Sequence, residues 1–171
     1  MASYFNVSGE LTKELLAPGD NVSVKNIALT NLQKVSKCKV DLYIEKKLTG
    51  KFYLLKGVEL PIGATLIYDD INFSNAENEF GLYIKLTDGA QFTLTGSIDV
   101  TGTNVNLPGT NTLYTSELSV GDEVTVTGET RTIATITNDT TATVTAAFGS
   151  DLANDTAVEC NPTALVDIII S

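Results

Sequence analysis

The chain has 171 residues, of which 43% are hydrophobic and 19% charged, so it can bury the core of one ordinary domain or of two small ones. It contains no histidine and no tryptophan, which excludes Ser-His-Asp and Cys-His nucleophile systems and histidine-based metal sites. A formal net charge of -10 disfavours nucleic acid and membrane surfaces as partners.

The N-terminal region is predicted to begin with a strand over 4–7 and to continue with one or two helical turns over 10–17. Ser8 can cap the helix, and Pro18-Gly19 would end it. This is the one helix that the sequence predicts. The first residues show neither a basic region nor a long apolar run, so no signal peptide is expected.

Alternation of polar and apolar residues then predicts strands. The clearest case is the segment 37–45, in which every second residue is apolar. Further strands are expected over 22–29, 52–58, 64–68 and 81–86. The second half continues with shorter strands, expected over 91–95, 97–101, 113–118, 123–127, 130–137 and 141–148. Short strands at even spacing indicate a small barrel or sandwich.

The composition changes near residue 87. Residues 1–86 contain ten lysines and ten acidic residues, whereas residues 87–171 contain Arg131 as their one basic residue against eleven acidic ones. Threonine rises from four residues to twenty across the same point. The sequence therefore predicts two units with different surface chemistry, and the second carries the whole net negative charge.

The final strand, expected over 164–170, is apolar and poor in threonine, like the strand over 81–86. We interpret it as a return to the first domain, which is then discontinuous (1–86 plus 164–171). Residues 87–163 would be an insertion between its last two strands, where insertions are tolerated. The expected fold is all-β: an Ig-like or jelly-roll-type β-sandwich that carries an inserted small Thr-rich β-barrel domain.

A family resemblance rests on the same segments. The run Tyr53-Leu54-Leu55-Lys56, followed by Val58, Pro61 and Gly63, and the closing Val166-Asp167-Ile168 are similar to small β-sandwich virion proteins of tailed bacteriophages. The inserted unit resembles a module of phage structural and fibre proteins. Within it, residues 118–126 also resemble the opening of SH3-like barrels, where a Val-Gly-Asp corner leads into a strand.

The resemblance implies a non-enzymatic virion structural protein without catalytic residues, cofactor or metal. A head decoration (cement) protein is the first expectation. The sandwich would dock on the major capsid protein or another virion protein, and the acidic domain would project outward. The resemblance also allows a neck or tail accessory protein and a homo-oligomer, including a trimer. The protein would be made in the host cytoplasm and reside in the virion.

Apolar residues near the N-terminus are the candidate partner-binding residues. Tyr4, Phe5, Leu11, Leu15 and Leu16 could form an arm that grips a protein lattice. Alternatively, these residues close the edge and the core of the sandwich itself. The sequence leaves both interpretations open.

A second class of function is a carbohydrate- or receptor-binding β-module that would use Tyr114, Tyr43 or Tyr83 as an exposed platform. The acidic loop over 69–79 could offer oxygen ligands to calcium, although its spacing matches no EF-hand, and a solvated loop is the alternative. Cys38 and Cys160 are interpreted as buried thiols, with a disulfide as the alternative.

Overall fold

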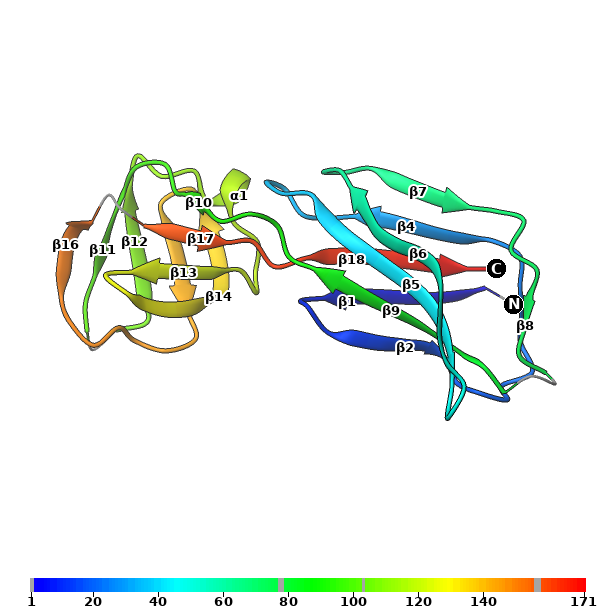
Figure 1. The fold of residues 1–171 in the computed structure, drawn as a ribbon. Coiled ribbons are helices and arrows are strands. Elements are labelled where there is room, and N and C mark those ends of the chain that lie inside the picture. Colours follow the sequence, from blue (N-terminus) through cyan, green and yellow to red (C-terminus); the bar gives the residue numbers. More distant parts are fainter. Residues whose placement is uncertain (1, 77–78, 103, 156–157) are drawn as a thin grey trace. The chain divides into compact units, whose positions relative to one another are not determined.

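The fold is described from a computed structural model that covers residues 2–76, 79–102, 104–155 and 158–171 (Figure 1). The structure is almost entirely β, with one short helix, α1 (Tyr114–Glu117). This confirms the predicted fold class of an all-β sandwich. None of the described helices is both long enough and apolar enough to span a bilayer.

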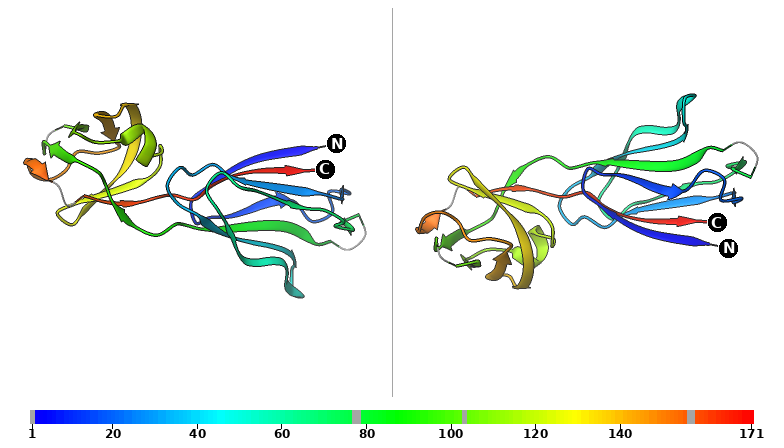
Figure 2. Two further views of the ribbon diagram at one scale, coloured as in Figure 1. Left: turned by 90° about the horizontal axis from the view of Figure 1, so that it is seen from above. Right: turned by 90° about the horizontal axis from the view of Figure 1, so that it is seen from below.

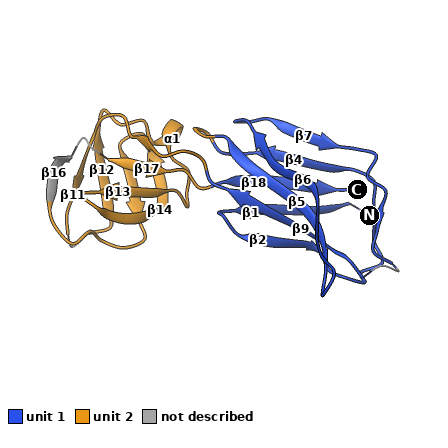
Figure 3. Cartoon of the chain, viewed as in Figure 1, with its two compact units in different colours: residues 1–33, 37–88, 164–171 blue, residues 34–36, 89–163 orange. Residues whose placement is uncertain are grey.

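The chain divides into two compact units (Figure 3). Unit 1 contains Met1–Gln33, Lys37–Asp88 and Ala164–Ser171. Unit 2 contains Lys34–Ser36 and Gly89–Thr163. Both units therefore include segments that are far apart in the sequence.

Unit 1 contains two four-stranded antiparallel sheets and a short third one. The first sheet has the order β1 (Ser3–Ser8), β18 (Leu165–Ile170), β4 (Ile27–Asn31) and β7 (Thr65–Tyr68). The second has the order β2 (Thr12–Leu16), β9 (Gly81–Thr87), β5 (Cys38–Lys46) and β6 (Gly50–Leu60). The third pairs β3 (Ser23–Val24) with β8 (Phe73–Ser74).

The core of unit 1 follows from the alternation in its strands. In β4, Ile27 and Leu29 are completely buried, and in β18 the side chains of Val166, Ile168 and Ile170 are buried in the same cluster. Residues between them face away from the core, because successive side chains of a strand point to opposite faces. One face of each sheet is therefore left for solvent or a partner.

Strand β18 lies between β1 and β4 and pairs antiparallel with both. The register aligns Ile169 with Tyr4 on one side and with Ala28 on the other. The last residues of the chain thus occupy an inner position of the first sheet (Figure 1). Whether residues 1–86 plus 164–171 fold independently of residues 87–163 stays a prediction.

Unit 2 contains an eight-stranded sheet and α1. The strand order is β10 (Phe92–Thr93), β17 (Glu159–Asn161), β13 (Glu123–Val126), β14 (Glu129–Asn138), β15 (Thr141–Val144), β12 (Asn106–Thr110), β11 (Ser97–Val100) and β16 (Leu152–Asp155). Its core is separate from that of unit 1 and includes Tyr114, Val124, Ile133 and Cys160.

Two local predictions were wrong. The segment 10–17, predicted as helix, contains strand β2, because Leu15 and Leu16 are anchored in the core and the backbone pairs with β9. The segment 113–118, predicted as a strand, contains α1. There the backbone N–H of Leu118 donates to the carbonyl of Tyr114 at 3.0 Å, which is a helical hydrogen bond.

Candidate functional site: the outer face of the first sheet

An exposed apolar row crosses the sheet β1-β18-β4-β7. Antiparallel register aligns Tyr4 with Ile169, Ile169 with Ala28, and Ala28 with Ile67. Tyr4 is 72% exposed, Ile169 44% and Ile67 65%. Because neighbouring strands lie about 4.8 Å apart, the row extends over about 14 Å. Directly opposed side chains of an antiparallel pair have Cβ atoms about 4.5–5.5 Å apart, so these residues form one row, with the half-buried Ala28 between Ile169 and Ile67.

A polar row lies beside the apolar row on the same face, two positions away in each strand. The register aligns Asn6 with Asp167, Asp167 with Thr30, and Thr30 with Thr65. The side-chain amide of Asn6 donates a hydrogen bond to Asp167 Oδ1 at 2.8 Å, and the Thr30 and Thr65 hydroxyls are 2.9 Å apart. These contacts fix the row, so the sheet presents an ordered apolar strip beside an ordered polar one.

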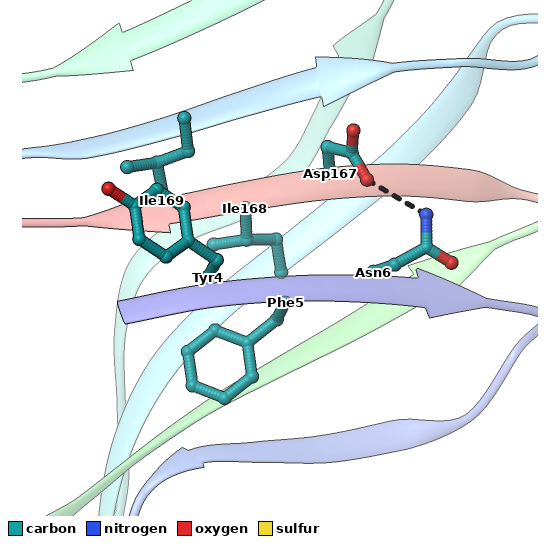
Figure 4. A pocket seen from close by; sticks show the side chains of 6 residues that line it. All are labelled: Tyr4, Phe5, Asn6, Asp167, Ile168 and Ile169. Carbon is teal, nitrogen blue, oxygen red and sulfur yellow. Dashed lines mark hydrogen bonds between the residues drawn. The ribbon is translucent and has the colours of Figure 1, made fainter. Parts of the chain in front are cut away.

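A hollow of 260 Å³ lies between the two rows at the β1–β18 end of the face (Figure 4). Its lining residues are Tyr4, Phe5, Asn6, Asp167, Ile168 and Ile169. Figure 4 shows Tyr4 beside Ile169, and Asn6 turned toward Asp167. Among these lining residues the acidic group is Asp167, so the hollow combines an apolar wall with a carboxylate.

The residues described on this face include no nucleophile paired with a base. Among the described residues no cluster of three or more histidine, cysteine, aspartate or glutamate side chains could hold a metal ion. A surface of exposed aliphatic and aromatic side chains beside hydrogen-bonded polar groups is typical of a protein interface.

The five predicted partner-binding residues are in different environments. Tyr4 and Phe5 line the hollow, with Tyr4 exposed and Phe5 packed partly against the core. Leu11 is exposed just before β2. Leu15 and Leu16 are buried in the core of unit 1, as in the alternative that has them close the sandwich. Their contacts with a partner stay a prediction.

Sequence reasoning missed the other members of the apolar row, Ala28, Ile67 and Ile169. Each lies at an outward position of its strand. The available signal was the run Ile168-Ile169-Ile170, in which the middle residue must point away from a core that contains the other two. Only the register then places Ile169 beside Tyr4.

The tyrosine platforms expected for a carbohydrate-binding module are wrong at two positions, because Tyr114 and Tyr43 are buried. Tyr43 lies between Tyr83 and Tyr53 on the second sheet, with ring centroids 5.6 and 5.5 Å away. The Tyr83 hydroxyl donates to Glu14 Oε2 at 2.8 Å. Desolvation, followed by this carboxylate, raises the pKa of Tyr83 to about 12.

The acidic loop has a structural anchor. Asn75 is buried, where its Oδ1 accepts the backbone N–H of Val22 at 2.9 Å and its Nδ2 donates to the Ala17 carbonyl at 2.7 Å. Glu77 and Asn78, which belong to the same loop and could also offer oxygen ligands, lie outside the described residues. Both ends of the Asn75 side-chain amide are thus hydrogen-bonded to backbone groups.

Both cysteines are buried and free. Burial raises the pKa of the Cys38 thiol to about 11 and raises that of Cys160 as well. A thiol with so high a pKa is almost wholly protonated near neutral pH and is a poor nucleophile. This confirms the interpretation of both residues as buried thiols.

Comparisons with known proteins give little further information. No protein-family model matches the chain, and no curated protein matches it either. Among solved structures, the crystal structure of PBSX exported protein XepA aligns with 100% of this chain and 86% of its own. The sequence identity is 11% and the TM-score 0.31. So loose a superposition supports no conclusion on fold or function.

Proposed function

We propose that this protein is a non-enzymatic structural component of a bacteriophage particle. The outer face of the sheet β1-β18-β4-β7 binds the major capsid protein in this proposal. The observation that carries it is the in-register row of Tyr4, Ile169, Ala28 and Ile67 across four strands, in which Ala28 is half-buried and the other three residues are exposed. Single exposed apolar residues are normal, but a continuous strip marks an interaction site.

The distribution of charge supports this arrangement. Unit 1 has nine lysines against twelve acidic residues, a net charge of -3, and unit 2 has Lys34 and Arg131 against nine acidic residues, a net charge of -7. The sandwich is therefore the less acidic unit and approaches a protein lattice with weaker repulsion. On a particle, an acidic unit facing solvent would keep particles from adhering to one another. The phage context rests on the resemblance of the Tyr53–Gly63 segment and of the closing strand to small virion proteins.

The carbohydrate-binding alternative has weaker support. A sugar platform needs an aromatic face open to solvent. Tyr43 and Tyr114 are buried, and the Lys56 ammonium lies 3.9 Å from the centroid of the Tyr53 ring. The Tyr53 ring, which is more exposed than those of Tyr43 and Tyr114, therefore already has a cation over its face.

Quantitative mass spectrometry of purified virions tests the proposal. We expect about one copy of this chain for each major capsid subunit or for every few of them, as a regular head lattice requires. A handful of copies would indicate a neck or tail accessory protein instead. Absence of the chain from purified particles would refute the virion proposal altogether.

A further inference from the structure

The hairpin between β5 and β6 ends in an unusual turn. The backbone N–H of Thr49 donates to the Lys46 carbonyl at 3.1 Å, and Leu48, the third residue of the turn, has φ +68°. A positive φ at this position favours glycine or asparagine, because other side chains clash with the backbone. The Leu48 side chain is 100% exposed, which no other large hydrophobic residue equals in the described part of the chain.

The turn lies beyond the body of the sheet. Pairing between β5 and β9 ends at Glu45 and Gly81, while β5 and β6 continue to pair as far as Lys46 and Gly50. Figure 2 shows the hairpin extending past the neighbouring strands of unit 1. A leucine that is both strained and fully exposed at a projecting tip stabilises nothing within its own chain. A backbone outlier of this kind motivates a hypothesis of function.

Three lysines surround this leucine. Lys46 pairs with Glu79 at 3.2 Å, and Lys51 pairs with Glu45 at 3.7 Å. Lys47 precedes Leu48 directly and forms no ion pair with the part of the chain that the structure describes. The tip thus presents an apolar side chain next to a lysine that is outside these ion pairs, with Glu79 and Glu45 lining the same surface hollows as Lys47.

The hollow on the first sheet has the complementary chemistry. Tyr4 and Ile169 form its apolar wall, and Asp167 supplies a negative charge. Its volume of 260 Å³ leaves room for an aliphatic side chain. The tip belongs to the second sheet and the hollow to the outer face of the first, on the other side of the same sandwich (Figure 2). One copy cannot fill its own hollow.

We propose that copies of this protein associate head to tail: Leu48 of one copy enters the hollow of the next, and Lys47 pairs with Asp167 there. Because the contact joins two different surfaces, it generates a ring or an open chain of copies rather than a twofold dimer. The inference deepens the proposed function, on which it rests, by linking neighbouring copies on a particle. Ile67 and Ala28 remain available for the capsid.

Sedimentation equilibrium of the full chain tests this contact, from about 10 µM to about 1 mM, the range in which a small interface of this kind associates. The wild type is expected to exceed twice the monomer mass as its concentration rises. Leu48→Asn removes the tip side chain and suits the positive φ, so it should fold at least as well as the wild type. Asp167→Lys leaves the tip intact but opposes Lys47 with a like charge.

Each variant alone should associate at least tenfold more weakly than the wild type. An equimolar mixture should form a one-to-one dimer and nothing larger, because Leu48→Asn retains the hollow and Asp167→Lys retains the tip. Val120→Asn, at an exposed aliphatic position of unit 2, is the matched control and should behave as wild type.

A wild type that stays monomeric throughout would overturn the inference. So would a Leu48→Asn chain that associates like the wild type, or a mixture of two folded variants without a dimer. The proposed function fails separately, through absence of the chain from virions or through unchanged capsid binding of Ile67 variants.

Discussion

Ile67→Ala tests the docking face at the end furthest from the hollow. Ile67 is 65% exposed in the edge strand β7, so docking can bury most of its side chain. Full burial of an isoleucine contributes about 1.5–3 kcal/mol, and the exposed share of that is about 1–2 kcal/mol. Truncation should therefore weaken binding by about 5- to 30-fold.

The assay is a titration of labelled protein onto purified particles that lack it, with the bound fraction measured after sedimentation. Val120→Ala is the matched control, since Val120 is an aliphatic residue with 64% exposure in unit 2. Circular dichroism should show both variants folded, because exposed substitutions usually change stability by less than about 0.5 kcal/mol. Binding of Ile67→Ala within twofold of the wild type, or equal losses in both variants, would refute the reasoning.

Three more predictions concern the two units themselves. Asp122 is buried and accepts the backbone N–H groups of Ser119 at 2.7 Å and Thr163 at 2.8 Å. Asp122→Ala should lower the free energy of unfolding in urea by about 2–4 kcal/mol, because two half-buried donors lose a charged acceptor. A loss smaller than that of the exposed Glu123→Ala would contradict this. Burial raises the pKa of Cys38 from 9.0 to about 11, so the folded state holds the thiol proton more tightly than the unfolded state. This contribution to stability is complete below about pH 9 and declines as the pH rises toward 11. Cys38→Ala should therefore flatten the decline of the unfolding free energy over this pH range. Limited proteolysis near Asp88 and Pro162 should release a stable acidic fragment, whereas a stable fragment from residue 87 to Ser171 would overturn the discontinuous first domain.

Strands with one buried face could be predicted from the sequence, and strands defined by distant pairing could not. The segment 37–45 alternates strictly, and the structure places β5 there because the apolar set fills the core. Strand β12 was missed because it contains Pro108-Gly109, a pair that normally indicates a turn. Residues 10–17 contain helix-forming residues, but pairing with β9 outweighs that weak preference.

The candidate site, like the fold, could be predicted from the sequence only where a local pattern indicates it. Tyr4 was identified as one of the apolar residues near the N-terminus, and it is a member of the exposed row. The row as a whole joins positions 4, 28, 67 and 169, which come together only through the register of three strand pairs. Local patterns carry no information on register across so many residues, so neither the row nor the hollow could be derived from the sequence.

The topology also determines when a docking face can exist. Strand β18 supplies Ile169 and Asp167, and it separates β1 from β4 in the sheet. Until residues 165–170 are in place, β1 has no hydrogen-bonding neighbour in this sheet, and the apolar row is divided. The last strand comes after residues 89–163 of unit 2 in the chain, so the face is completed only when those residues have been synthesised. A chain shortened by residues 164–171 should therefore bind no particles, even where unit 2 retains its own fold.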